Sequence, residues 1–155
     1  MSIKEKQDFL KEQLPQLFST LNAVAKGKWG VLNAQQMVEH LSDAVREANG
    51  KTPKKILTAS DVLPRAKAFM MSDKPFKENT KNAEMSEVPA AVKQPSIQAA
   101  LAELQNEIKD FFIVFEKEPA KIITNPFFGD LNFDEWTHLL YKHTTHHCRQ
   151  FELIE

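Results

Sequence analysis

Apolar residues recur every three or four positions along four stretches of the chain, and this spacing predicts four amphipathic helices. The first stretch runs from residue 3 to about residue 24, where Pro15 predicts a kink or a break into two pieces. The second starts at Asn33, which forms a capping-box pattern with Gln36, and it stops at Asn49-Gly50.

The other two helices are marked as clearly. The third is predicted from Ser96 to about Glu116, with one proline just before it and another just after. The last occupies Leu131 to Phe151, and Asn132 with Glu135 supplies its capping box. No strand alternation, hairpin signal or internal repeat is evident, so the pattern indicates an all-α fold built as a four-helix bundle.

Residues 51–94 form a long excursion between the second and third helices, in which the apolar periodicity weakens and prolines recur. We expect this excursion to be partly helical, with a short helix around Asp61 to Met71 capped by Ser60. The segment Lys51 to Asn82 contains eight Lys/Arg and three Asp/Glu. That positive excess is typical of a solvated loop, and the alternative is an electropositive lid beside a site for an anionic substrate.

Two shorter connections carry aromatic residues. Trp29 lies in the loop Lys26–Gly30 and should fold back onto the helices, because an exposed indole would leave much apolar surface in water. The turn Asn125–Asp130 contains Phe127 and Phe128, and we expect both rings to dock onto the bundle.

Composition narrows the class of protein. A chain of 155 residues that is 42% hydrophobic and 26% charged fits one domain, residues 1–155. The net charge of -1 argues against a nucleic-acid-binding protein. One cysteine excludes an internal disulfide, and the charged first residues and the lack of a long apolar run predict neither a signal peptide nor a membrane span. We therefore expect a cytoplasmic protein.

Four of the five histidines lie in the last helix. His143 and His147 are one helical turn apart and continue the apolar stripe of that helix, so both rings should point inward. On the same helical wheel, His138 points toward solvent and His146 lies on the flank. The fifth, His40, lies on the second helix at the edge of its buried face.

Metal binding is the leading hypothesis for these residues. Imidazoles at i and i+4 present two ligands to one ion, and His40 on a facing helix can add the third. Three neutral ligands leave coordination positions open for water or substrate, and they suit one divalent transition metal such as Zn, Ni or Fe. The alternative is a hydrogen-bonded histidine pair at the edge of the core, because buried imidazoles need partners for their nitrogens.

Other kinds of site fit the sequence poorly. A zincin-type metalloprotease needs Glu directly after the first histidine of the pair, where this chain has Thr144. A di-iron bundle needs Glu three residues before a histidine on two helices, and neither His40 nor His143 has one. Cys148 lies about 100° around the helix from His147, which is unfavourable for a Cys–His nucleophile and more typical of a small packing residue. The four scattered glycines form no phosphate-binding loop.

The motifs taken together resemble a known superfamily. They are Gln36-Met37-Val38-Glu39-His40 after Trp29-Gly30, then Asn125-Pro126-Phe127-Phe128-Gly129, Glu135-Trp136, and His143-x-x-His146-His147-x-Arg149-Gln150-Phe151. This set looks like the DinB/YfiT-like superfamily, and within it a subgroup catalogued as a domain of unknown function. The resemblance covers almost the whole chain and is weakest between Lys51 and Gln94. It implies a four-helix bundle with up-down-down-up connectivity and one metal ion held by His40, His143 and His147.

The resemblance also implies an activity. Characterised relatives are metal-dependent enzymes that join low-molecular-weight thiols to electrophiles, or related hydrolases and isomerases. The chain is therefore expected to be a thiol S-transferase or a hydrolase of small electrophiles, with a small-molecule substrate such as a low-molecular-weight thiol as its partner. Asp43, His146 and Gln150 are candidates for supporting the ligands from behind, although Asp43 also fits a solvated role on the polar face. The alternative is a non-enzymatic helical binding or stress-related module without a catalytic metal, for which a homodimer is one expected form.

Overall fold

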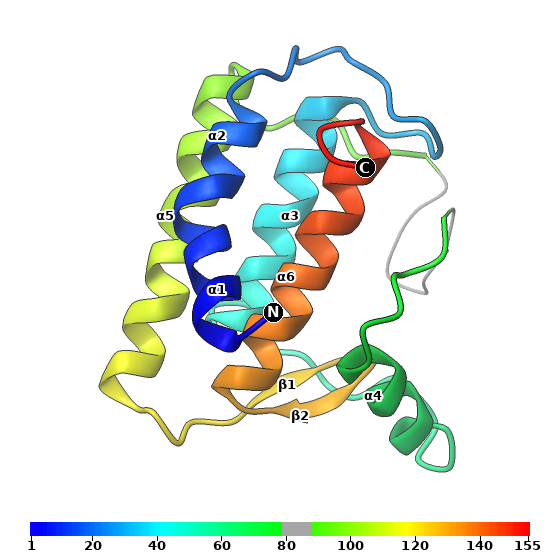
Figure 1. Ribbon diagram of the computed structural model, residues 1–155, viewed down its shortest axis with the longest axis vertical. Coiled ribbons are helices and arrows are strands. Elements are labelled where there is room, and N and C mark those ends of the chain that lie inside the picture. Colours follow the sequence, from blue (N-terminus) through cyan, green and yellow to red (C-terminus); the bar gives the residue numbers. More distant parts are fainter. Residues whose placement is uncertain (79–87) are drawn as a thin grey trace.

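The computed structural model describes residues 1–78 and 88–155, and the described chain is mostly helical. Its elements in chain order are α1 (Ile3–Asp8), the π-helical segment η1 (Phe9–Gln13), α2 (Leu14–Phe18), α3 (Ala34–Ala48), α4 (Leu63–Met71), α5 (Ile97–Lys117), β1 (Ile123–Asn125), β2 (Gly129–Leu131) and α6 (Phe133–Gln150). Figure 1 shows α1–α2, α3, α5 and α6 side by side, with the two strands and α4 at one end. None of the helices in the described residues has the length and apolar character that a membrane span requires.

The core lies between the long helices and uses the predicted apolar stripes. Met37, Leu41 and Val45 of α3 are buried, and α3 packs most extensively on α5. The predicted caps at Asn33 and Asn132 both form complete capping boxes, which set where α3 and α6 begin. These two helix starts position the residues of the candidate site.

The first helical stretch is shorter and less regular than predicted. It ends at Phe18 rather than near residue 24, and the Ser19 hydroxyl that follows bonds back to a carbonyl of the last turn. The irregularity comes just before Pro15, which has no N–H to donate, and Leu14 N–H instead reaches Phe9 O in a π-type turn. The predicted interruption is therefore a change of winding within a continuous helical path.

A short antiparallel hairpin of β1 and β2 was not predicted. Strands of three residues are too short to show an alternating pattern in the sequence. The turn between them lies where a turn was expected and is held by Asn125 Oδ1, which accepts the N–H groups of Phe127 and Phe128 at 2.8 and 3.0 Å. Trp136 Nε1 donates to Ile123 O at 2.9 Å, and this bond fixes the hairpin to the base of α6.

The short helix α4 lies where it was expected, but its predicted cap is wrong. It begins at Leu63, and Val62 precedes it without a side-chain cap, so Ser60 has no capping role. The opposite end of α4 is held by α6. Lys142 Nζ donates to three carbonyls there at 2.8 to 3.3 Å, and a lysine in this place also complements the negative end of the helix dipole.

His138 is buried, which contradicts the prediction that it faces solvent. Only 5% of its surface is exposed, because α1 and the end of α4 cover this side of α6. Its Nε2 lies 3.2 Å from Ser72 O and its Nδ1 lies 2.7 Å from Lys6 Nζ. The Nε2–H therefore donates to the carbonyl while Nδ1 accepts from the lysine. A helical wheel of α6 alone could not show that other elements cover its polar side.

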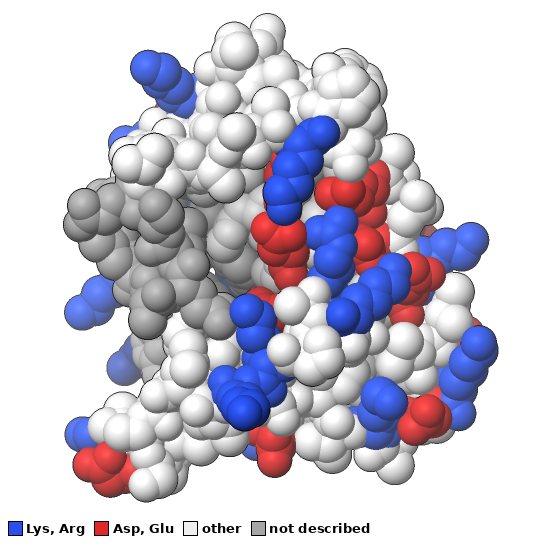
Figure 2. All heavy atoms as spheres, turned by 180° about the vertical axis from the view of Figure 1, so that it is seen from behind, with Lys and Arg blue, Asp and Glu red and all other residues white. Residues whose placement is uncertain are grey.

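Two basic side chains of the excursion, Lys51 and Lys67, are paired with carboxylates. Lys51 Nζ lies 2.6 Å from both Glu107 and Asp110 of α5, and Lys67 Nζ lies 2.8 Å from Glu135. Figure 2 shows basic and acidic side chains mixed over one face of the molecule. This pairing favours a solvated surface over an electropositive lid, and residues 79–82 of the predicted segment lie outside the described residues.

Candidate metal centre

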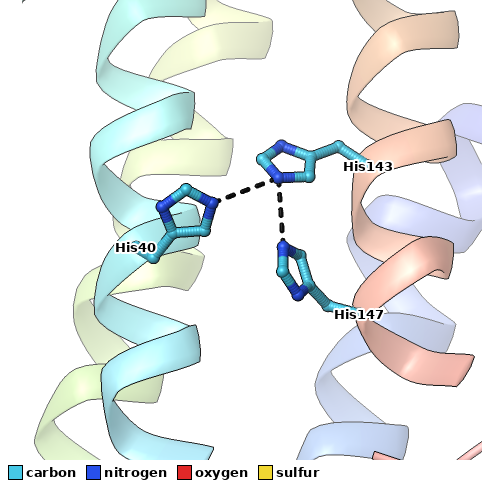
Figure 3. A group of neighbouring side chains, drawn as sticks. All are labelled: His40, His143 and His147. Atoms are coloured by element: carbon cyan, nitrogen blue, oxygen red, sulfur yellow. Dashed lines mark hydrogen bonds between the residues drawn. The ribbon is translucent and has the colours of Figure 1, made fainter. Parts of the chain in front are cut away.

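Three histidines meet between α3 and α6. His143 Nε2 lies 3.1 Å from His147 Nε2 and 3.2 Å from His40 Nε2. Figure 3 shows the three rings directed toward one another from the two helices. One nitrogen from each ring lies within 4.8 Å of the other two, so the three residues could hold a metal ion. The structure thus brings together the three predicted ligands.

The three histidines are not equally buried. His147 is 7% exposed, whereas His40 and His143 are only half-buried. The spacing of His143 and His147 stacks them on one face of α6, and His40 comes from the edge of the buried stripe of α3. His147 is therefore the most buried residue of the three.

Gln150 fixes the proton position of His147. Its Oε1 lies 2.7 Å from His147 Nδ1, while its Nε2 donates to Trp29 O at 2.9 Å. Because the amide nitrogen must face that carbonyl, the amide oxygen faces the imidazole and accepts the Nδ1 proton. His147 Nε2 then carries a lone pair directed at the cluster.

Hydrogen bonds among the three rings leave His143 in conflict. Its Nε2 carries either one lone pair or one proton. With a lone pair, it faces the lone pair of His147 at 3.1 Å. With a proton, it forms one strong hydrogen bond or two weaker shared ones, so a neighbouring lone pair of His40 or His147 is poorly satisfied. A cation at the centre would accept all three lone pairs.

The surroundings favour neutral imidazoles. Burial lowers the pKa of His143 well below its usual value, and the adjacent His147 and His40 lower it further. Burial also lowers the pKa of His147 to about 3, and it lowers the pKa of His40 against the opposing effect of Asp43. An added proton is therefore an unfavourable way to resolve the conflict. Neutral nitrogen ligands are what a transition metal requires.

The spacing of the nitrogens suits a small divalent ion. With Zn–N bonds of about 2.0–2.1 Å in a tetrahedral arrangement, the ligand nitrogens lie roughly 3.3 Å apart. The two separations from His143 Nε2, 3.1 and 3.2 Å, are close to this value. Along these two edges the cluster needs little rearrangement to accept the ion.

Asp43 and His146, the other two candidates for supporting the ligands, lie differently. The exposed Asp43 pairs with Arg46 at 2.9 Å, in a network with two carboxylates of α5, which favours its solvated role. The His146 ring lies beside that of His147, with centroids 5.3 Å apart, and also contacts the Trp29 ring at 5.4 Å. His146 therefore adjoins the cluster and faces an aromatic neighbour on its other side.

Cys148 is fully buried next to the cluster in the sequence. Burial raises the pKa of its thiol to about 12, so the reactive thiolate is scarce near neutral pH. This environment is that of a packing residue.

The loop around Trp29 folds back onto the structure as expected, but its contact with the site was missed. Lys28 N–H donates to Gln150 O at 2.7 Å, next to the bond from Gln150 to Trp29 O. At Gly27 a Cβ would lie only 2.7 Å from Gln150 Cγ, and Gly30 has φ +78°. Glycine permits both the close approach and the positive φ. The pair of glycines around Trp29 was the available signal in the sequence.

The fold and the cluster define a class of protein: a mostly helical chain with three histidines, from two helices, placed where they could hold one metal ion. No family model, curated protein or solved structure matches the chain. The assignment of a function therefore rests on the geometry of the cluster and its surroundings.

We expect the metal-free protein to lose stability as the pH falls below about 6.5. Burial lowers the pKa of every histidine in the fold from the ordinary value of 6.5; these are His40, His138, His143, His146 and His147. Just below that pH the unfolded chain binds more protons than the folded chain. The contribution of the neutral histidines to the free energy of unfolding is therefore complete above about pH 6.5 and is lost as the pH falls. Urea unfolding at about pH 7.5, 6.5 and 5.5 measures this, and equal midpoints would contradict it.

Proposed function

We propose that this protein is a metal-dependent enzyme of the DinB/YfiT-like type, in which His40, His143 and His147 hold one divalent transition metal, Zn, Ni or Fe. The observation that carries the proposal is the position of His143 Nε2 between the other two Nε2 atoms, at 3.2 and 3.1 Å. Hydrogen bonding alone leaves a lone pair poorly satisfied there, and metal binding removes the conflict.

The proposal includes a four-helix bundle with up-down-down-up connectivity. It is supported by the course of the chain in Figure 1, where the colours run one way along α1–α2 and α6 and the other way along α3 and α5. In such a bundle α3 and α6 run antiparallel, and ligands from facing helices meet in the interior.

When bound, the ion would supply Lewis acidity, which lowers the pKa of a thiol or a water molecule and makes a nucleophile available near neutral pH. The proposed reactions are transfer of a low-molecular-weight thiol to a small electrophile, or hydrolysis of such an electrophile. Three neutral imidazoles contribute no negative charge, so the site favours an anionic reaction partner. His40 and His143 are less fully buried than His147, and we infer that the partner approaches from their side.

Metal analysis of the protein purified without a His tag tests the proposal. We expect about one equivalent of a transition metal per chain, or binding of added Zn²⁺ or Ni²⁺ with sub-millimolar affinity. Less than about 0.2 equivalents, together with no binding at that affinity, would reject the enzyme and favour the non-enzymatic module.

Gln150→Leu should weaken metal binding by about 10- to 100-fold while all three histidines stay in place. Leucine cannot accept the Nδ1 proton of His147, so the bond that directs the Nε2 lone pair at the cluster is lost. Competition with a chromophoric chelator measures the affinity. Gln150→Glu keeps an acceptor for the Nδ1 proton but loses the donor to Trp29 O, so it should lose less affinity than Gln150→Leu. If Gln150→Leu binds metal as tightly as the unmodified chain, the amide has no supporting role.

A further inference from the structure

A pocket beside the histidine cluster contains an arginine that has no bonding partner among the described residues. It has a volume of about 770 Å³ and lies where the loop around Trp29, the segment after α4 and the end of α6 meet. Phe76, His146 and Arg149 are among its lining residues. The volume is in the range of small-molecule sites, so the side chains that line the pocket determine which ligand it would bind.

Arg149 carries the charge that decides this question. Its side chain is half-buried, and within residues 1–78 and 88–155 no carboxylate or other acceptor lies at bonding distance from the guanidinium. The carboxylates that line the same pocket are exposed and do not pair with it; they are Glu78, Glu152 and Glu155. The exposed Lys28 and Lys77 are screened by solvent. A half-buried guanidinium offers a fork of N–H donors that matches a carboxylate.

The carbonyl groups at the end of α6 do not bind the Arg149 guanidinium either. Carbonyls at the end of a helix attract cations when they are unpaired. Here the last four carbonyls of α6 already accept backbone N–H groups, from residues 151–153 and from Lys28, at 2.7 to 3.1 Å. The guanidinium is therefore left for a ligand in the pocket.

Aromatic rings line the same pocket as Arg149. The His146 ring contacts Trp29 and Phe76, with centroids 5.4 and 6.2 Å away. Phe76 stacks in turn on Phe128 at 6.3 Å, which holds its ring from behind. These rings present faces and edges against which a planar apolar group can pack. Because His146 also contacts His147 at 5.3 Å, the pocket adjoins the cluster.

From these contacts we propose that the pocket binds an organic anion with a planar apolar body, of the aryl carboxylate class. The carboxylate accepts parallel N–H donors from Arg149, and the ring packs against Trp29 and Phe76. The role of this anion as a substrate rests on the proposed function, whereas its binding uses no residue of the metal cluster. Because His146 lines the pocket and contacts His147, an anion bound there would lie beside the histidine cluster.

Calorimetric titration of the intact chain with benzoate, benzamide and acetate tests the two parts of the ligand separately. Benzoate should bind saturably and at least about tenfold more tightly than benzamide, which lacks the charge, and than acetate, which lacks the ring. Equal affinity for benzamide or acetate, or no saturable binding of benzoate, would overturn the proposal.

Variants locate the binding. Arg149→Gln should lower the affinity for benzoate at least about tenfold, and Arg149→Lys should lower it less, because lysine keeps the charge but not the fork. Arg65→Gln, at an exposed position of α4, is the matched control and should leave the affinity unchanged. Circular dichroism checks that each variant is folded. If Arg149→Gln does not fold, the benzoate affinity of Arg149→Lys is the deciding measurement. Unchanged benzoate affinity in the folded Arg149 variant would place the anion elsewhere and reject the pocket.

The variant His143→Ala separates this proposal from the metal site. Benzoate should bind this variant within about threefold of its affinity for the unmodified chain, and binding should still depend on Arg149. If binding disappears with His143, benzoate was a ligand of the metal, and the pocket proposal fails while the metal site stands. If metal never binds but benzoate does, the pocket stands and the proposed enzyme fails.

Discussion

Replacing His143 with alanine should remove essentially all bound metal from the protein. We expect the transition metal to fall from about one equivalent to less than about 0.2 per chain. The affinity for added Zn²⁺ should drop more than about 100-fold, because loss of a direct ligand exceeds the 10- to 100-fold effect of losing a supporting partner. His143 is the central residue of the cluster, since its Nε2 contacts the Nε2 atoms of both His40 and His147.

The same substitution should leave the metal-free protein folded. His143 is half-buried, and its removal also removes the conflict of protons and lone pairs among the three rings. Chemical unfolding in metal-free buffer should change by less than about 1.5 kcal/mol, and a loss above about 3 kcal/mol would favour a packing role. The matched control is His146→Ala, which deletes a neighbouring imidazole from the same helix and should keep about one equivalent of metal.

Trp136→Ala should have the largest effect on folding. The indole is 1% exposed and is the largest of the fully buried side chains in the described residues. Its Nε1 donates to Ile123 O at 2.9 Å. Alanine would leave a cavity at the base of α6 and an unpaired carbonyl in the hairpin. We expect a loss of about 3–5 kcal/mol, a large part of the roughly 5–15 kcal/mol that stabilises a typical domain.

Trp136→Phe divides this loss into its two causes. Phenylalanine keeps most of the buried volume but cannot donate to Ile123 O, so it should cost about 1–3 kcal/mol. Urea unfolding of both variants measures the difference, and Val24→Ala, at a position that is 72% exposed, is the control that should change little. A loss below about 1 kcal/mol for Trp136→Ala would show that the base of α6 can close around the gap.

Local signals in the sequence predicted most of the helical structure. The predicted caps Asn33 and Asn132 lie at the starts of two long helices, and the third begins after Ser96, as its predicted start indicated. The wide apolar stripe of α5 is buried as expected, including Phe111 and Phe115. Periodicity and caps act within one or two turns, and a single sequence displays them directly.

Contacts between distant segments could not be predicted in this way. His138 is buried by Lys6 and by the end of α4, which are remote from it in the sequence. The position of the hairpin is fixed by the bond from the Trp136 indole to Ile123 O. Each of these features is decided by which element covers which face, and helical periodicity carries no information about that.

In the candidate site, too, the features set by local spacing were predicted and those set by contacts between distant segments were not. The pair His143 and His147 follows from spacing on one helix, and His40 followed from its place at the edge of a buried stripe. Asp43, three residues after His40, was a candidate by spacing alone, but Arg46 draws its carboxylate to the surface network. To predict the pocket of Arg149, one would have to know that a loop from the first third of the chain lies against the end of α6.

Gly27 links two positions that stand far apart in the sequence. Because a Cβ there would meet Gln150 Cγ at 2.7 Å, a larger residue at 27 is compatible only with a shifted or shorter side chain at 150. The two positions should therefore change together during evolution. A search pattern for chains with this site would join Gly-x-Trp-Gly to a distant His-x-x-x-His-x-x-Gln. A chain that keeps the histidines but has lost that pairing would share the cluster without the bond that orients His147.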